Sequence, residues 1–542
     1  MSYKKIAWYV LFILLALITG FFAGNLIPVK PLKHILNTGN KVDLLIDIIN
    51  EEYVDTINTK NLIENAITKI VAELDPHSMY IPANALETVN ENMDGRFAGV
   101  GINAILYWDT IIINSVIPGS PAEQAGILAG DRIIVIDDTI ATGSDLSEDK
   151  AKEILHGKVG TSVKLGIKRA ETDTLLKYRI TRSYVPLNSV KAAYEIANGI
   201  GIIKIYDTFT NSTYDEFISA IAKLLHKGCK SFIIDLRMNK GGSFDAAVNI
   251  CNEFLSKGQT IVYMEGRAFP REYVTANGLG TLQDKQVIVL VDQISASASE
   301  IVAGAIQDND RGLVIGRCSY GKGLVQNQIE LSDGSAVRLT VARYFTPSGR
   351  NIQRKYEMGK TDEYIQEWVN RLSSGEGLYK DSIVFNTLNS YFTSKGRKVY
   401  GGGGIMPDIF IPFDTTELTS YYLNLENKGI FNKFAFEYSD ANRSKLKAFN
   451  NSEDMLQYLK KQILISDIVR FAETKGIKRR SYLINISTNQ ILNMTYAHIL
   501  QNFFGDEAYF SLILNNDPLV KRAIEEIEKG NSSPQAVANL QN

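Results

Sequence analysis

Short apolar segments alternate with amphipathic stretches through residues 199–350, and this alternation constrains the fold of the 542-residue sequence more than any other feature. Apolar strands that are separated by helices pair mostly in parallel, and a parallel sheet needs helices on both faces. The sequence therefore predicts an α/β core. The expected strands are Ile200–Ile205, Phe232–Leu236, Ile261–Met264, Val287–Val291 and Leu313–Ile315, and the expected helices are Tyr214–Leu225, Phe244–Leu255 and Ser297–Gln307.

Two further segments have strand-like patterns. Residues 324–346 alternate in polarity around Asp333-Gly334, which is typical of a β-hairpin. From Phe97 onward, short strands and turn signals follow one another. The expected elements there are strands at Ile111–Val116, Arg132–Ile136 and Ser162–Lys168, a short helix that begins at Ser120-Pro121, and a helix over Asp149–Leu155.

The N-terminal segment predicts the compartment. Lys4 and Lys5 precede an apolar run from Ile6 to Ile27, which spans a hydrocarbon core of ~30 Å at ~1.5 Å rise per residue. The lysines favour a cytoplasmic N-terminus, so we expect a single-pass protein of the inner membrane with its catalytic part on the periplasmic, extracytoplasmic side. A cleaved signal peptide is the alternative, although no A-x-A site follows the run.

Helical patterns flank the strand-rich segments. Apolar residues recur at helical spacing in two stretches within residues 40–74, and the chain beyond Pro412 is helix-like. The expected regions are a membrane anchor at 1–30, an N-terminal helical region at 31–88, a β-rich domain at 89–184, the α/β core at 185–412 and a C-terminal helical region at 413–542.

Composition excludes several classes of protein. The formal net charge of -2 lacks the basic excess that nucleic acid binding requires. The five histidines include no HExxH motif and the three cysteines have no zinc-type spacing, so we expect no metal site. Cys229 and Cys251 could pair in an oxidising compartment, but the sequence favours buried free thiols.

Ser297 is the polar residue with the most informative setting. It follows the expected strand Val287–Val291 and opens a helix, where backbone N–H groups can stabilise an oxyanion. The pattern Ser297-x-x-Glu300 is also that of an ordinary capping box. Because serine so often occupies N-cap positions, the residues alone favour the capping role.

A nucleophilic serine needs a base, and Lys322 is the base that the sequence offers. It lies between two glycines just after a strand, and burial would have to lower the pKa of its amine from ~10.4 towards ~7–8. Gln326 follows four residues on, so on an extended segment it shares a face with Lys322. The alternative for Lys322 is an ordinary solvated lysine.

A phosphate-binding loop is a rival interpretation of the same segment. Gly316–Lys322 matches the spacing G-x-x-x-x-G-K, but the next residue is Gly323 in place of the serine or threonine that binds magnesium. Such a loop also opens a helix, whereas Val325–Phe345 alternates as strands. These two differences exclude the phosphate loop.

Two glycine loops are candidate sites of backbone recognition. Gly241-Gly242 follows a strand and lets a substrate carbonyl approach backbone amides, although a simple turn explains it equally well. The loop Gly99-Val100-Gly101-Ile102 offers amides that suit the carboxylate of a peptide C-terminus, with strand addition fixing the peptide. The alternative is a small β domain that only packs on the core.

Seven motifs, in this order over about residues 40–412, resemble the carboxyl-terminal processing peptidases, also called tail-specific proteases: LDPHS, GVGI, SPAEQAG, GDRI, DLRMNKGG, SASASE and YGKGLVQ. The resemblance implies a crotonase/ClpP-like serine protease core with an inserted PDZ domain at 89–184, and no cofactor. It also implies a serine–lysine dyad 25 residues apart, which selects Ser297 and Lys322, with Gln326 in support. The implied oxyanion donors are the amides of Gly241 and Ala298.

We therefore expect a membrane-anchored serine endopeptidase that cleaves extracytoplasmic proteins near their C-termini. Its partners would be proteins or peptides with free C-termini and, for the N-terminal helix, membrane lipid. One alternative is a catalytically inactive PDZ scaffold at the membrane, and another is a serine–histidine hydrolase that uses His77 or His226. The sequence leaves open whether the chain forms a homo-oligomer.

Overall fold

The computed structural model describes residues 3–26, 40–107, 109–143, 148–169, 172–380 and 390–530, which fall into two compact units. The first unit, residues 1–70, contains α1 (Tyr3–Leu26), α2 (Lys41–Glu52) and most of α3 (Thr59–Ala72). The two helices expected within residues 40–74 are confirmed as α2 and α3.

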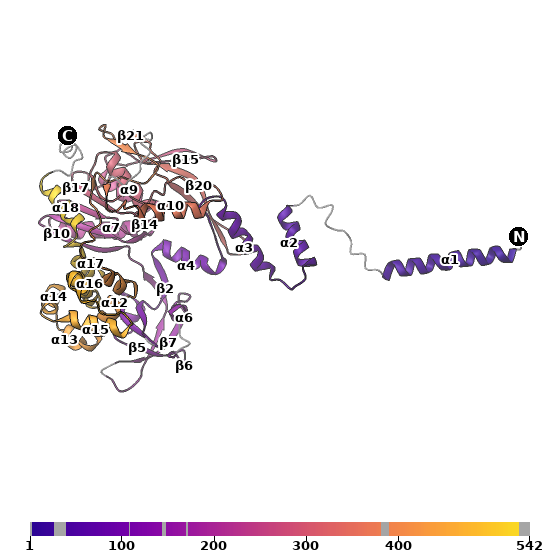
Figure 1. The fold of residues 1–542 in the computed structure, drawn as a ribbon, viewed down its shortest axis with the longest axis horizontal. Coiled ribbons are helices and arrows are strands. Elements are labelled where there is room, and N and C mark those ends of the chain that lie inside the picture. Colours follow the sequence, from indigo (N-terminus) through magenta and orange to yellow (C-terminus); the bar gives the residue numbers. More distant parts are fainter. Residues whose placement is uncertain are drawn as a thin grey trace. The chain divides into compact units, whose positions relative to one another are not determined.

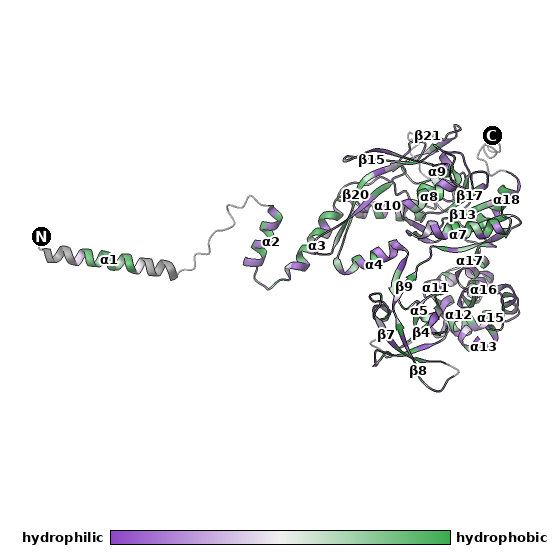
Figure 2. Cartoon of the chain, turned by 180° about the vertical axis from the view of Figure 1, so that it is seen from behind, coloured by the Kyte–Doolittle hydropathy of each residue, from purple (hydrophilic) through white to green (hydrophobic). Residues whose placement is uncertain are grey.

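Helix α1 is apolar through its described middle part (Figure 2). Its large apolar side chains from Trp8 to Ile18 are all exposed. Among the described residues, no helix combines the length and the apolar character of a membrane span. The membrane anchor at 1–30 stays a prediction.

The second unit, residues 71–542, is built around a six-stranded sheet (Figure 1). All neighbours in this sheet are parallel except the first pair, which is antiparallel. The α/β core that the sequence predicts is thus present. In spatial order the strands are β10 (Val190–Ala197), β11 (Ile200–Ile205), β13 (Ser231–Asp235), β17 (Gln286–Val291), β18 (Leu313–Gly316) and β23 (Ile409–Phe410).

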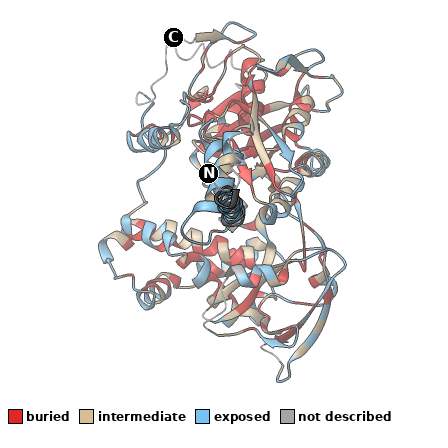
Figure 3. Cartoon of the chain, turned by 90° about the vertical axis from the view of Figure 1, so that its right-hand side faces the viewer, coloured by how far each residue is buried: buried red, intermediate tan, exposed pale blue. Residues whose placement is uncertain are grey.

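Helices cover both faces of this sheet, and its central strands β11, β13, β17 and β18 are buried (Figure 3). Alternate side chains of each strand point to opposite faces. One face packs on α7 (Thr213–His226), α8 (Phe244–Phe254) and α9 (Ala298–Asp308). The other face packs on α18 (Pro518–Glu528) and the end of α17 (Asp506–Leu514). The packed core therefore extends past residue 412, because C-terminal helices cover half of it.

A second sheet differs from the sequence expectation. The segment Ile261–Met264 was expected in the parallel sheet, but it lies in β15 (Thr260–Gly266), which pairs antiparallel with β16 (Phe269–Thr275) and β20 (Ala336–Phe345). Apolar content alone does not distinguish two sheets, which explains the error. The expected hairpin at 324–346 is confirmed as β19 (Leu324–Glu330) and β20.

The β-rich module has its own sheet and its own apolar cluster. Strand β3 is one edge of the sheet, since it pairs only with β4 among the described strands, and β8 is the other edge. Beyond β9 (Ser183–Pro186) the chain enters the core sheet. The module contains β2 (Arg96–Gly99), β3 (Ile102–Tyr107), β4 (Thr110–Val116), α5 (Pro121–Gln124), β5 (Arg132–Ile136), β6 (Thr139–Ile140), α6 (Glu148–Leu155), β7 (Ser162–Lys168) and β8 (Leu176–Thr181).

The C-terminal segment is helical, as expected, and its helices before α18 share one apolar cluster. The longest of them, α16 (Ser481–Phe504), contacts most of the others. These others are α11 (Ser420–Asn427), α12 (Ile430–Ala441), α13 (Arg443–Leu446), α14 (Ser452–Lys460) and α15 (Leu464–Thr474).

The elements that were not expected from the sequence include three that connect the larger parts. Helix α4 (Ala83–Asp94) precedes the β-rich module, and α10 (Thr361–Ser373) follows the hairpin. The short strand β1 (Met79–Ile81) pairs antiparallel with β20.

Candidate active site

Ser297 lies where the chain turns from β17 into α9. Its backbone has φ 53° and ψ -113°, in the positive-φ region that residues other than glycine rarely adopt. The residue is half-buried, and its N–H donates to Glu300 Oε2 at 2.9 Å. The expected capping box is therefore present, and the strained backbone is an additional feature that ordinary caps do not need.

Lys322 and Gln326 lie side by side. The amine of Lys322 donates to Gln326 Oε1 at 3.0 Å, and Gln326 Nε2 donates to the carbonyl oxygen of His77 at 2.5 Å. The second bond fixes which end of the amide faces the lysine. Asp75 holds the backbone around His77 in place, because its carboxylate accepts from the N–H groups of His77 and Ser78, both at 2.8 Å. The LDPHS motif thus carries the acceptor that orients Gln326.

Glu300 joins the serine helix to the lysine loop. It is fully buried, and its Oε2 accepts from the N–H groups of Ser297 and of Lys322, the latter at 2.8 Å. Its Oε1 accepts from the Ser319 hydroxyl at 2.5 Å and from the Gly321 N–H at 2.7 Å. Four donors on one carboxylate fix the two segments in a single arrangement.

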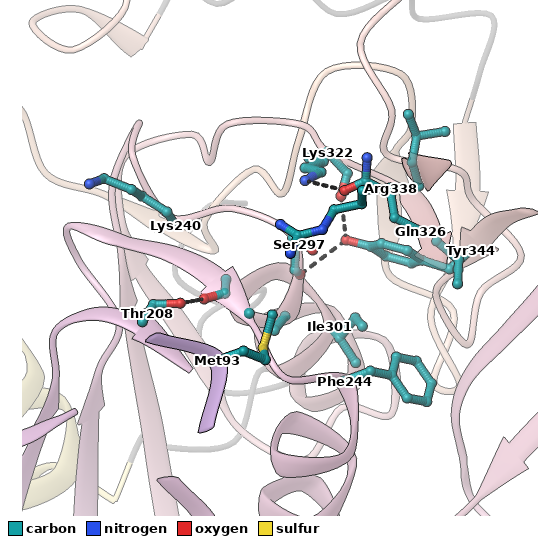
Figure 4. A pocket seen from close by; sticks show the side chains of 15 residues that line it. Met93, Thr208, Lys240, Phe244, Ser297, Ile301, Lys322, Gln326, Arg338 and Tyr344 are labelled. Atoms are coloured by element: carbon teal, nitrogen blue, oxygen red, sulfur yellow. Dashed lines mark hydrogen bonds between the residues drawn. The ribbon is translucent and has the colours of Figure 1, made fainter. Parts of the chain in front are cut away.

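Tyr344 completes this connection from the opposite side. Its hydroxyl lies 2.7 Å from the carbonyl oxygen of Lys322 and 3.1 Å from that of Ser297 (Figure 4). Glu300 therefore binds the amides of the two residues, and Tyr344 lies at their carbonyls. A side chain from β20 and one from α9 together set the distance between the candidate nucleophile and the candidate base.

The electrostatic environment favours a neutral lysine. Burial lowers the pKa of the Lys322 amine below its ordinary value, and the positive charge of Arg338 lowers it further, while Asp75 and Glu300 act in the opposite direction. Burial raises the pKa of the Glu300 carboxyl, against the effect of its hydrogen bonds. No hydrogen bond joins the Lys322 amine to the Ser297 hydroxyl in the described part of the chain.

The glycine turn approaches the serine closely. Gly241 has φ +92°, and a Cβ on it would lie 2.6 Å from the Cβ of Ser297 and 3.0 Å from the Ala298 nitrogen. The N–H of Gly241 donates to Asn239 Oδ1 at 2.9 Å in this conformation. Gly241 and Ala298 are thus brought together beside Ser297, and the roles assigned to their amides stay predictions.

A cavity of about 280 Å³ opens over these residues (Figure 4). Ser297, Lys322, Gln326, Gly241 and Ala298, which the sequence identifies, all line it. The other lining side chains come from segments that are far apart in the sequence, and no local pattern indicates that they lie at this site. Apolar groups dominate among them: Met93, Phe244, Ile301, Leu324, Val325 and Tyr344, with Thr208, Lys240 and Arg338 as polar members.

The two histidines of the alternative hydrolase do not line the cavity. His77 Nε2 lies 3.1 Å from the Tyr364 hydroxyl, and burial together with the charge of Lys322 lowers the pKa of His77 to about 4. His226 is exposed in the last turn of α7. Neither is placed to accept a proton from Ser297. The three cysteines are buried and free.

The loop Gly99–Ile102 connects β2 to the free edge strand β3. Gly101 has φ +86°, and a Cβ on it would strike the side chain of Ser120 at 2.1 Å, so only glycine fits there. A bridge joins Gly99 to His156, which directly follows α6. The end of α6 thus lies beside the loop, and β3 leaves its outer edge available for an added strand.

Three sequence families match this chain. Peptidase family S41 matches residues 199–366, a PDZ domain matches 112–169, and a family of unknown function matches 421–505. The peptidase match contains the Ser297 helix, the Lys322 loop and the glycine turn. The PDZ match lies within the β-rich module.

Two curated relatives are named as carboxy-terminal processing proteases. The chain is 38% identical over 314 residues to a carboxy-terminal-processing protease of Bartonella bacilliformis, covering 57% of this chain and 71% of that protein. It is 34% identical to the carboxy-terminal processing protease CtpB of Bacillus subtilis, covering 58% and 66% respectively. Among solved structures, a photosystem II D1 C-terminal processing protease is 29% identical, covering 58% of this chain and 84% of that one, with a TM-score of 0.34.

Proposed function

Because the chain belongs to peptidase family S41, with the carboxy-terminal-processing proteases, and is a serine-type peptidase with a PDZ domain, we propose that Ser297 is its nucleophile and Lys322 its general base. The observation that carries this assignment is the joint fixation of both residues by Glu300 at one cavity. The intact set also argues against the alternative of an inactive scaffold.

The proposed reaction begins at the Ser297 hydroxyl. The oxygen attacks the scissile carbonyl carbon while its proton passes to the neutral amine of Lys322, and an acyl-enzyme forms as the amine product leaves with a proton. Water then attacks the ester and releases the new C-terminus. For the first step the Lys322 amine must turn from Gln326 towards Ser297, a small motion that substrate binding can drive.

The amides at the glycine turn and the start of α9 are the proposed oxyanion donors. Ala298 is the first residue of α9, where the helix dipole also favours negative charge. For the Gly241 N–H to take part, it must leave Asn239 Oδ1 for the oxyanion. The apolar side chains in the cavity, such as Met93, Phe244 and Ile301, favour an apolar substrate side chain beside the cleaved bond.

The PDZ module is proposed to select free C-termini. Amides of Gly99–Ile102 would bind the carboxylate, and the peptide would add as a strand to the free edge of β3. Substrates would then be proteins with exposed, extended tails, cleaved near those tails.

We expect wild type to cleave a peptide with an apolar, free C-terminal tail, and Ser297→Ala to leave it intact. Amidation of the same C-terminus should slow cleavage by wild type about tenfold or more, since it removes the charge that the loop would bind. Rates of product formation for the acid and the amide, with Ser297→Ala as the blank, provide the measurement. Equal rates for acid and amide would contradict carboxylate capture, and an active Ser297→Ala would contradict the nucleophile.

We also propose that α1 attaches the protein to the inner membrane, with the protease on the periplasmic side. The exposed apolar side chains from Trp8 to Ile18 and the lysines that precede them in the sequence support this location. The protein is expected in the membrane fraction, and its catalytic part should be digested when protease is added to intact spheroplasts. A soluble protein, or one that is protected from the added protease, would contradict the proposal.

A further inference from the structure

Asp517 is the N-cap residue of α18, and its two carboxylate oxygens make different contacts. Asp517 Oδ1 caps the helix by accepting from the N–H groups of Leu519 and Val520 at 2.8 and 3.1 Å. Asp517 Oδ2 accepts from Arg237 Nη1 at 2.7 Å. The capping role needs only Oδ1, so the ion pair with Arg237 is an independent feature.

Arg237 lies two residues after the end of β13 and four residues before Gly241, the glycine beside Ser297. Its guanidinium also forms two hydrogen bonds to Asp235, at 3.0 and 2.6 Å. Burial disfavours the charged guanidinium, but the charges of Asp235 and Asp517 more than offset this and raise the pKa of Arg237. The guanidinium is therefore fixed from two sides, by Asp235 at the end of β13 and by Asp517 in the C-terminal region.

The turn that starts at Arg237 ends at the oxyanion glycine. Next in the chain, Met238 has φ 60° and donates its N–H to both oxygens of Asp292. Asn239 follows, and its side chain accepts from the Gly241 N–H and from the Ser299 hydroxyl, both at 2.9 Å. Only three residues separate Arg237 from Gly241, so a displacement of Arg237 would also shift the backbone of Gly241.

The charges around this turn are balanced. Three basic groups, Lys204, Arg237 and Arg317, face three acidic groups, Asp235, Asp292 and Asp517. Five of the six side chains are at most 11% exposed, so water screens them weakly. Removal of the Asp517 charge would leave an excess positive charge beside the turn and would take away the partner of Arg237 Nη1.

We propose that the C-terminal helical region positions the oxyanion turn, and that Asp517 is the positioning residue through its ion pair with Arg237. The inference rests on the proposed function, because it assumes that the turn at Gly241 stabilises the transition state. It gives a catalytic role to the segment 413–542, which contains a match to a family of unknown function and is otherwise a helical cover of the sheet.

The variant Asp517→Asn tests the proposal, since asparagine keeps the capping oxygen and replaces only the oxygen that binds Arg237. We expect kcat for a short apolar peptide to fall about 10- to 100-fold, because small errors in the placement of oxyanion donors have effects of this size. KM and the midpoint of the pH–rate profile should stay at the wild-type values, since neither the substrate contacts nor Lys322 changes.

A matched control exists at the other end of the same helical region. Asp440 pairs with Arg132 of the PDZ module at 2.5 Å, so Asp440→Asn makes the same chemical change away from the turn. This control should retain wild-type kcat for a short peptide. Wild-type kcat in Asp517→Asn would overturn the inference, as would a loss that Asp440→Asn shares, or one accompanied by a shifted KM or pH midpoint. If Ser297→Ala were active, the proposed function would fail instead.

Discussion

Lys322→Arg is expected to lose ~10²–10⁴-fold of the peptide-cleavage rate while the protein stays folded. Arginine preserves the positive charge and the approximate length, but its pKa above ~12 prevents it from accepting a proton at neutral pH. If Lys322 only contributed charge, arginine would retain substantial activity. The measurement is kcat/KM on a peptide, with the thermal unfolding temperature measured in parallel.

Two further measurements distinguish a Lys322 that acts as a general base from one that only contributes a positive charge. Lys322→Met removes the charge and keeps the length, so it should be as inactive as the arginine variant if proton transfer is what matters. In wild type, kcat/KM should rise with pH and level off below the ordinary lysine pKa, since burial and Arg338 lower the pKa of Lys322 and the neutral amine is the active form. An active arginine variant beside an inactive methionine one would show that only charge is needed.

The local elements of the core could be predicted because each has its own sequence signal. The strand β11 occupies Ile200–Ile205, as expected, and α9 begins one residue after the expected start at Ser297. The setting of Ser297 between a buried strand and a helix was likewise visible. The order of strands in the sheets was not, because apolar residues in β15 and in β13 produce the same pattern in the sequence.

The connections of the site could not be predicted, since they join segments that are far apart in the chain. The capping-box pattern predicted that the Ser297 N–H donates to Glu300. Nothing in this pattern indicates that the same carboxylate also accepts from Ser319, Gly321 and Lys322. Arg338 and Tyr344 lie in a hairpin with ordinary strand alternation. The pair Arg237–Asp517 spans 280 residues, so no local pattern reports it.

Glu300→Gln is expected to lower kcat at least 10²-fold, which is the second large effect. The amide has the shape of the carboxylate, but its NH2 group cannot accept hydrogen bonds. With its NH2 group towards Ser297 and Lys322, the amide would release both backbone N–H groups. In the other orientation it would release the Gly321 N–H, whereas the Ser319 hydroxyl can turn and accept from the amide. Because this fixation sets the spacing of nucleophile and base, the reaction should suffer more than substrate binding.

Loss of stability alone would also reduce activity, and a second buried glutamate controls for it. Glu253 in α8 is almost as buried and accepts from the Tyr214 hydroxyl at 2.8 Å and from the N–H and hydroxyl of Thr281 at 2.8 and 2.9 Å, yet it does not line the cavity. Glu253→Gln should therefore lower the unfolding temperature by a similar amount and leave kcat of the folded protein near that of wild type. The comparison is made well below both unfolding temperatures. If the two variants lost activity equally, Glu300 would stabilise the fold without positioning the dyad; a selective loss in Glu300→Gln would assign it the positioning role.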